Sequence, residues 1–305
     1  MAIISKELFG AMSSFMITWN PQEYPYTETY WECENIAYVE QYGGTLPSLD
    51  YAPPGADHGV SVVSVGHADY TFTTDVDELI KIGHINDQIK NDGTEYTPED
   101  LIEDIATIHK QKGRVKLSFG GKGFPMGLNI CSHADIDEFV ANVTGVIAQD
   151  RFDGIDFDLE DGGCPADLQI ALFKQLHKAL KGKTLMSLSL PPLALYLEPY
   201  GTVVKETASL FDHITIKTFN AYWPGYDFFQ DIQRLEDFGV KRRNIILAVM
   251  PGVNDDGVET TVETCQNLAE FVRRHDLRGI SIWPCYLDDN GQFADTISKV
   301  FEDTR

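Results

Sequence analysis

Residues 153–160 read Asp-Gly-Ile-Asp-Phe-Asp-Leu-Glu, and the alternation within them decides the fold. Successive side chains of a β-strand point to opposite faces, so a strand here places the carboxylates of Asp156, Asp158 and Glu160 on one face. The apolar side chains between them then lie on the other face, where helices can cover them. The stretch therefore predicts a strand of an α/β barrel, with carboxylates lining the interior and rising towards the end that carries the active site in such barrels.

Three carboxylates on one buried face repel one another, which favours protonation of one of them. We expect Glu160, at the end of the run, to hold that proton, as a general acid must. The pattern alone leaves open a solvated acidic turn and a site for Ca²⁺ or Mg²⁺. The strict alternation with apolar residues disfavours the turn, and the spacing lacks the glycine and the loop length of an EF-hand.

Strand-like segments recur along the chain, separated by amphipathic stretches. The eight predicted strands are Ser14–Trp19, Gly59–Gly66, Arg114–Gly120, Phe152–Asp158, Thr184–Leu190, His213–Phe219, Asn244–Met250 and Gly279–Trp283. Such alternation predicts parallel βαβ units, and this number in 305 residues predicts a single-domain (β/α)8 TIM barrel spanning residues 1–305. Asn20–His58 and His67–Gly93 exceed a simple helical connection, so we predict long loop insertions after the first and second strands.

Helix signals fall between these strands. Thr97 followed by Pro98 and two acidic residues is typical of a helix start, because threonine caps the first turn and proline fits the first helical position. The predicted helices are Leu101–Gln111, His133–Gln149, Pro165–Leu180, Asp227–Phe238 and Glu259–His275.

The charge balance excludes two classes of partner. The chain has 47 acidic and 24 basic residues, which gives a net charge of -23. This field repels the phosphates of nucleic acids and the headgroups of anionic membranes, whereas a neutral substrate is compatible with it. No apolar run approaches the roughly 18 residues of a membrane span. Met1–Phe15 also lacks the long apolar segment of a secretory signal peptide, so none is evident.

Three motifs resemble those of glycoside hydrolase family 18, which contains chitinases and endo-β-N-acetylglucosaminidases. Residues 153–160 match the family's DGxDxDxE signature, in which we expect Asp153 and Gly154 to shape the entry into the strand. Residues 116–121, Lys-Leu-Ser-Phe-Gly-Gly, resemble the SxGG segment of the third barrel strand. Ile280–Trp283 resembles the last strand, which ends in a tryptophan that floors the −1 subsite. The motifs occur in family order, so the resemblance covers nearly the whole chain.

The resemblance implies substrate-assisted, retaining catalysis. In this mechanism Glu160 protonates the leaving oxygen, and the substrate's own 2-acetamido carbonyl attacks the anomeric carbon to form an oxazolinium ion. Asp158 orients the acetamido group, and Asp156 shares a proton with Asp158. Water activated by Glu160 then opens the ring. The family implies no metal ion and no organic cofactor.

One position departs from the family pattern. The sixth strand of the family presents a tyrosine whose hydroxyl hydrogen-bonds the acetamido group, and an Asp or Asn follows it. Here Phe219 occupies the tyrosine position and Asn220 the next. Phe219 has no hydroxyl, so Tyr222, three residues further on, is the candidate that supplies it.

Aromatic and small residues near the strand ends complete the expected site. Sugar rings present C–H groups that stack on aromatic faces, so we expect Trp19, Trp223 and Trp283 to contact the glycan. The segment containing Ser118, Gly120 and Gly121 resembles a turn that leaves room for the substrate. With Phe219 and Asn220, these residues form the predicted substrate-binding set.

The sequence therefore predicts a chitinase-type glycosidase that degrades N-acetylglucosamine polymers such as chitin at their β-1,4 linkages. An endo-β-N-acetylglucosaminidase acting on glycoprotein glycans is one alternative. A chitinase-like lectin without turnover is another, which Phe219 favours and the complete acidic run disfavours. We expect a monomer whose partner is a glycan containing N-acetylglucosamine, and the substrate class favours an extracellular location.

The first prediction concerns the missing hydroxyl. Tyr222→Phe is expected to lower the hydrolysis rate of a chromogenic chito-oligosaccharide by about 10²–10³, the cost of losing one well-placed donor. Phe219→Tyr is the matched variant and leaves the rate unchanged, because Tyr222 already supplies the hydroxyl. The reverse pattern of rates contradicts the assignment.

Overall fold

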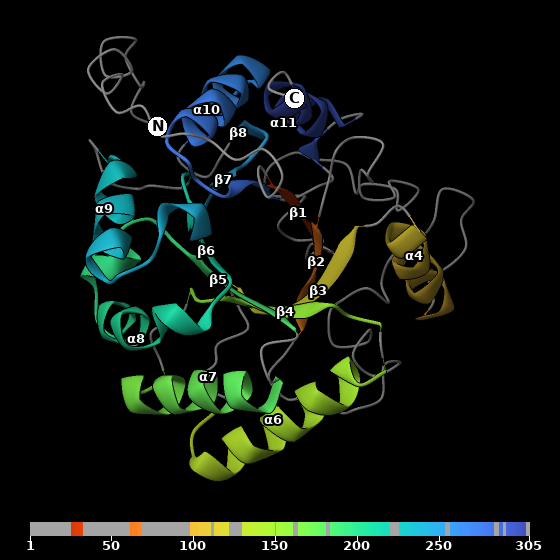
Figure 1. Ribbon diagram of the computed structural model, residues 1–305, viewed down its shortest axis with the longest axis vertical. Coiled ribbons are helices and arrows are strands. Elements are labelled where there is room, and N and C mark those ends of the chain that lie inside the picture. Colours follow the sequence, from red (N-terminus) through yellow and green to blue (C-terminus); the bar gives the residue numbers. More distant parts are fainter. Residues whose placement is uncertain are drawn as a thin grey trace.

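Eight parallel strands close into a barrel in the computed structural model (Figure 1). The structure describes residues 26–32, 62–68, 98–110, 113–121, 130–149, 151–160, 164–180, 184–219, 226–253, 257–283, 287–288 and 291–302. The strands are β1 (Tyr26–Glu32), β2 (Val62–Ala68), β3 (Arg114–Gly120), β4 (Gly154–Asp158), β5 (Leu185–Leu190), β6 (His213–Lys217), β7 (Ile245–Val249) and β10 (Gly279–Ile282). Strand β1 pairs with both β2 and β10, which closes the ring and confirms the predicted (β/α)8 barrel.

Seven of the predicted strands match barrel strands to within a few residues. The prediction for the first strand is wrong, because Tyr26–Glu32 fills that place in the barrel. Its sequence, Tyr-Thr-Glu-Thr-Tyr-Trp-Glu, mixes β-branched and aromatic residues with two acids, so it does not form the continuous apolar run typical of buried parallel strands. Ser14–Trp19 lies outside the described residues, and Trp19 precedes the first strand instead of following it.

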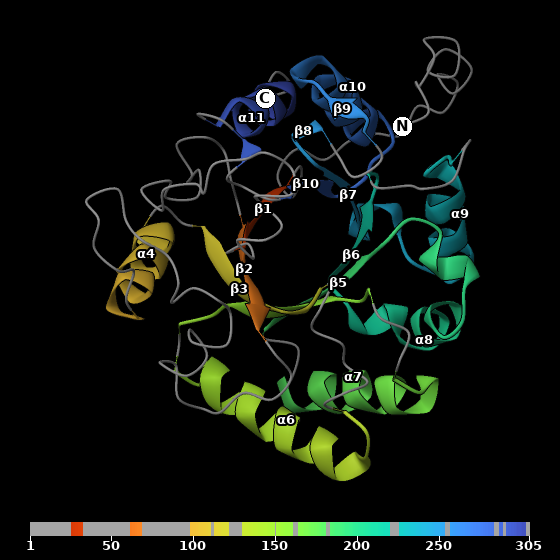
Figure 2. The same cartoon turned by 180° about the vertical axis from the view of Figure 1, so that it is seen from behind.

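The described helices surround the ring of strands, as both views show (Figures 1 and 2). They are α4 (Pro98–Lys110), α6 (His133–Ile147), α7 (Ala166–Leu180), α8 (Tyr200–Thr207), α9 (Phe229–Asp237), α10 (Val262–Arg274) and α11 (Gln292–Glu302). Five of them match the predicted helices, whereas α8 and α11 were not predicted. The predicted insertion Asn20–His58 contains strand β1, which corrects that prediction, and its other residues lie outside the described part of the chain. His67–Gly93 also lies outside the described residues, apart from His67 and Ala68 at the end of β2.

Short elements complete the described chain. They are the 3₁₀ turns η3 (Ala194–Tyr196), η4 (Ala208–Leu210) and η5 (Arg242–Asn244), and the two-stranded hairpin of β8 (Gly252–Val253) and β9 (Glu259–Thr260). No helix within the described ranges is both long and apolar enough to cross a membrane.

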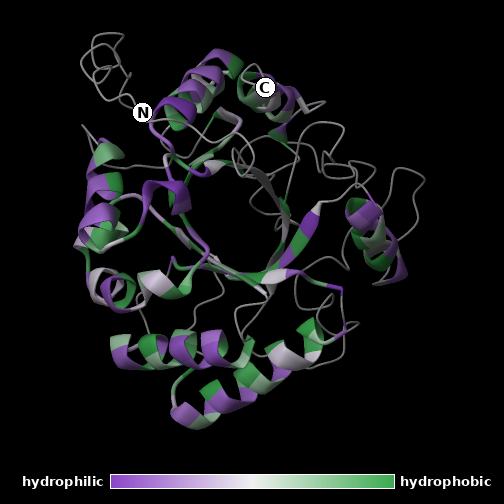
Figure 3. Cartoon of the chain, in the orientation of Figure 1, coloured by the Kyte–Doolittle hydropathy of each residue, from purple (hydrophilic) through white to green (hydrophobic). Residues whose placement is uncertain are grey.

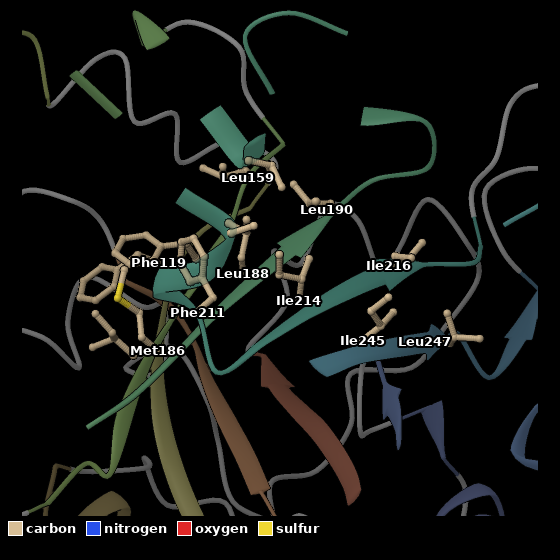
Figure 4. Close-up of a cluster of buried hydrophobic side chains, with 14 of the residues drawn as sticks. Phe119, Leu159, Met186, Leu188, Leu190, Phe211, Ile214, Ile216, Ile245 and Leu247 are labelled. Carbon is tan, nitrogen blue, oxygen red and sulfur yellow. The ribbon is translucent and has the colours of Figure 1, made fainter. Parts of the chain in front are cut away.

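The apolar core lies between the barrel and its helices. Each helix carries hydrophobic and hydrophilic residues together (Figure 3), as expected when one face meets the barrel and the other meets solvent. Phe157 on β4 packs edge-on against Phe173 of α7, with ring centroids 4.9 Å apart. A close-up of part of this core shows aliphatic side chains from β5, β6 and β7 together (Figure 4).

The interior of the barrel is unusually polar. The register aligns Ser118, Asp156 and Ser187 in one row across β3, β4 and β5, and the next row contains Asp158 and Ser189. TIM-barrel interiors are more often filled by branched apolar side chains. Here the fully buried polar residues include Ser64, Lys116, Ser118, Asp156, Ser187, His213, Thr215 and Ser281. The fold thus directs apolar side chains outwards and functional groups inwards.

The residues at the entry to β4 have structural roles, as expected. The Asp153 carboxylate accepts a hydrogen bond from the backbone N–H of Val115 at 2.8 Å and lies 2.9 Å from Nε2 of His109. It therefore ties β4 to β3 and α4. Gly154 lies so close to β5 that an added Cβ would fall 2.6 Å from the Cβ of Leu185.

Gly154→Ala tests this close approach of two strands. Because β5 cannot yield without distorting the barrel, we expect the free energy of unfolding to fall by about 1–3 kcal/mol, the usual cost of overpacking. The measurement is the midpoint of chemical denaturation. An unchanged midpoint would contradict the close approach.

Candidate active site

Asp156 is held rigidly on the inner face of β4. It is fully buried, and its Oδ2 accepts a hydrogen bond from the hydroxyl of Ser118 at 2.8 Å. Its Oδ1 accepts a second from the hydroxyl of Ser187 at 2.5 Å. The three residues occupy one row of the sheet, so the backbone register itself brings them together. Asp156 therefore has a fixed orientation between β3 and β5.

A buried lysine balances the charge of Asp156. Lys116 is 0 % exposed, and its Nζ lies 3.7 Å from Oδ1 of Asp156. The same ammonium group donates to the hydroxyl of Ser187 at 2.5 Å and lies 3.2 Å from Nε2 of His213. Because an ammonium group can only donate, His213 accepts at Nε2. A charge in this interior is tolerated only with such partners.

A second lysine contacts the upper two carboxylates. Nζ of Lys217, the last residue of β6, donates to Oδ2 of Asp158 at 2.7 Å and also to Oε1 of Glu160. Burial alone lowers the pKa of Lys217, but the attraction of the two carboxylates outweighs burial and raises that pKa well above its usual value. Lys217 is therefore a permanent ammonium ion at the top of the barrel.

Glu160 differs from the carboxylates below it in its access to solvent. Asp158 is 3 % exposed, whereas Glu160, two residues beyond the end of β4, is exposed. Alternation along the strand thus produces a graded series, from a buried and fully bonded Asp156 to a solvent-accessible Glu160. Of the three carboxylates, Glu160 is the one most accessible to a molecule arriving from solvent.

Two aromatic rings lie beside this carboxylate series. Phe219 and Trp283 stack in parallel, with ring centroids 5.5 Å apart and planes inclined by 7°. Phe219 is 5 % exposed and packs with Ala248 and Met250, while Trp283 is partly exposed. Phe219 therefore supports the tryptophan ring from behind. Nζ of Lys217 lies 5.9 Å from the centre of the same ring, within cation–π range.

The turn after β3 requires its glycines. Gly120 and Gly121 have φ values of 99° and 82°, in the left-handed region that favours glycine. The N–H of Gly121 donates to the backbone carbonyl of Asp158 at 2.9 Å, so the turn is tied to the carboxylate strand.

The structure brings most of the predicted site residues to one end of the barrel. Asp156, Asp158, Glu160, Ser118, Gly120, Gly121, Phe219 and Trp283 all lie on or just beyond the carboxyl-terminal halves of β3, β4, β6 and β10. Trp19, Asn220, Tyr222 and Trp223 lie outside the described residues. Within the described ranges, no cluster of His, Cys, Asp and Glu side chains is arranged to hold a metal ion.

Sequence reasoning missed both lysines of the site. Lys116 and Lys217 each occur in a strand whose residues are nearly all buried, at a position whose neighbours two residues away face inwards. A lysine is almost never fully buried unless it is paired. Both lysines fall in predicted buried strands of a chain that also has a buried acidic run. That combination was the signal that could have identified Lys116 and Lys217 as partners of the carboxylates.

Comparisons with known proteins identify the family and the fold. The model of glycosyl hydrolases family 18 matches residues 35–241. A family 18 chitinase from Pseudoalteromonas aurantia is 18% identical, with a TM-score of 0.65 over 90% of this chain and 99% of that chain. A chitinase from Rhizomucor miehei is 14% identical, with a TM-score of 0.64 and the same coverage of both chains.

A third structure, the catalytic domain of psychrophilic chitinase B from Arthrobacter TAD20, is 13% identical, with a TM-score of 0.66 over 93% of this chain and 96% of that chain. At such identities these likenesses establish the fold. A comparison with curated protein sequences gives no match.

Lys116→Met tests whether the buried ion pair supports the site. The variant leaves Asp156 as an uncompensated buried charge, so we expect the free energy of unfolding to fall by about 3–5 kcal/mol. Lys110→Met, at an exposed position of α4, is the matched control and is expected to change it by less than about 0.5 kcal/mol. Equal denaturation midpoints for the two variants would contradict the role assigned to Lys116.

Proposed function

The chain belongs to glycosyl hydrolases family 18, and we propose that it hydrolyses β-1,4 linkages in N-acetylglucosamine polymers, with chitin or chito-oligosaccharides as substrates. The observation that carries this proposal is the graded carboxylate series of Asp156, Asp158 and Glu160 beside the partly exposed ring of Trp283. An acid next to an aromatic platform is what cleavage of a stacked sugar requires.

Each carboxylate has a distinct part in the proposed reaction. Glu160, the accessible one, protonates the leaving oxygen and later activates water. Asp158 is held beside Glu160 by the shared Lys217, so it is placed to orient the acetamido group and to stabilise positive charge on it. Asp156 is held by two hydroxyl groups and fixes the base of the series. No second carboxylate is needed as nucleophile, because the substrate's own acetamido carbonyl takes that role.

The solved structures support the choice of substrate. The similar proteins from Pseudoalteromonas aurantia, Rhizomucor miehei and Arthrobacter are each described as chitinases. The site also needs no charge on the substrate, because the described lysines are already engaged by carboxylates. A neutral N-acetylated sugar is therefore the chemistry that fits both observations.

A glycan-binding protein without turnover is the second candidate. Two observations favour it. The ammonium group of Lys217 contacts the same carboxylate that must deliver a proton, and Phe219 brings a ring without a hydroxyl to the site. The retained carboxylate series favours hydrolysis. A direct assay distinguishes the two candidates.

Glu160→Gln is the test of hydrolysis. Glutamine keeps the size of the side chain but cannot transfer a proton, so kcat for a chromogenic chitotrioside is expected to fall by about 10²–10⁴, the usual contribution of a general acid. Glu263→Gln, at an exposed position in the first turn of α10, is the matched control and leaves kcat unchanged.

Two results decide against this proposal. Undiminished hydrolysis by Glu160→Gln removes Glu160 from the mechanism. Saturable binding of chitotriose by the wild-type protein, with no hydrolysis at any pH from about 4 to about 8, favours the glycan-binding candidate.

A further inference from the structure

Lys217 occupies the centre of the proposed active site. Its ammonium group has three N–H bonds, of which one is directed to Asp158 and another to Glu160. The group also lies within cation–π range of Trp283, the expected floor of the sugar site. The lysine is 8 % exposed, so solvent screens these contacts only weakly. Lys217 thus contacts Asp158 and Glu160 and lies near the ring of Trp283.

The lower part of the barrel does not require this lysine. Asp156 already has Lys116 as its counter-ion and accepts hydrogen bonds from Ser118 and Ser187. Lys217 is paired instead with Asp158 and Glu160. Among the described side chains, Asp158 and Glu160 are both paired with the same ammonium group.

Other charges near the upper carboxylates come from the described side chains of β3, β4 and β6. Strand β3 contributes Lys116, β4 contributes Asp156, and β6 contributes His213 below Lys217. The inward positions of β5, β7 and β10 carry hydroxyl, apolar or aromatic side chains, namely Ser187, Ser189, Ile246, Ala248, Ser281 and Trp283. Within the described side chains, Lys217 is therefore the cation that directly contacts Glu160.

An ammonium ion at hydrogen-bond distance favours the charged form of a carboxylate. A general acid must carry a proton when the substrate arrives, so this contact works against the first step of the proposed reaction. The oxazolinium ion that follows is a cation, and a neighbouring ammonium ion repels it. Both effects of Lys217 oppose turnover at neutral pH, and neither opposes binding of a neutral sugar.

We propose that Lys217 is an internal counter-ion shared by Asp158 and Glu160 in the resting site, and that it thereby restricts hydrolysis to acidic pH. The inference rests on the proposed function, because it assigns a regulator to the acid of that reaction. As the pH falls, Glu160 takes up a proton while Lys217 stays charged. The contact between them then weakens, and Glu160 becomes a competent acid with Asp158 still held in place.

The decisive variant is Lys217→Met, which keeps the length of the side chain and removes the charge. Removing a nearby cation favours the protonated form of Glu160. In the pH profile of kcat/KM, the basic limb is therefore expected to move to higher pH by about one unit or more. At a pH on that limb, kcat/KM is then expected to rise by about tenfold. Lys217→Arg keeps the cation and is expected to retain the wild-type pH profile.

Lys217→Gln is the second uncharged variant, and it is the one to measure if the Lys217→Met protein does not fold. It is expected to show the same shift of the basic limb. An unmoved basic limb in the uncharged variant that folds, or a loss of kcat at every pH, overturns the proposal, because Lys217 then supports the reaction or only the structure. Wild-type protein that binds chitotriose without hydrolysing it, together with hydrolysis by Lys217→Met, supports the counter-ion role in its strongest form.

The glutamate variant separates this inference from the proposed function. Glu160→Gln in the Lys217→Met background is expected to abolish the gained activity. If hydrolysis persists in that double variant, the proposed role of Glu160 fails. If Glu160→Gln abolishes activity and the basic limb does not move in Lys217→Met, the counter-ion role alone fails.

Discussion

The pairing of charges inside the barrel is the constraint on which this structure depends. Desolvated carboxylates are tolerated only with cations and hydrogen-bond donors at contact distance. Lys116, Ser118 and Ser187 contact Asp156, and Lys217 is paired with Asp158 and Glu160. The acidic series of β4 therefore exists only together with residues of β3, β5 and β6. Because the sheet register aligns these strands, the fold and the site are specified by the same pairing.

This constraint also explains how the molecule divides its side chains. Along β4, Ile155 and Phe157 face the helices, where they join the large apolar core, and the acids between them face inwards. The stabilisation of the fold comes mainly from that outer core, because burial of apolar surface is the dominant favourable contribution. The barrel interior is thus free to hold polar groups. Apolar burial outside supports a polar and chemically competent interior.

Much of the fold could be predicted from the sequence because it follows a local period. Alternation identified β4, and apolar runs identified six more barrel strands. The first strand was assigned wrongly, because its barrel place is taken by a segment with glutamates where an apolar run was expected. Helices α8 and α11 were not predicted. Helix α8 has only 8 residues, and so short a segment contains too few turns to show a clear helical period of apolar residues.

The site was predictable only in part, for a related reason. The carboxylates form one continuous motif, whereas the lysines that neutralise them lie on other strands and carry no motif of their own. Lys116 precedes Asp156 by 40 positions and Lys217 follows Glu160 by 57. Only the closed barrel brings them together. The structure therefore reveals ion pairs between residues that lie far apart in the sequence. Because of these pairs, Glu160 is an acid with a neighbouring counter-ion and not an isolated one.

The most direct measurement of this account is a crystal structure of the Glu160→Gln protein with bound chitotriose. The account predicts one sugar ring stacked on Trp283, its acetamido group at Asp158, and its glycosidic oxygen within hydrogen-bond distance of residue 160. It also predicts Lys116 beside Asp156 and Lys217 beside Asp158. A glycan bound away from Trp283, or carboxylates separated from these lysines, would contradict it.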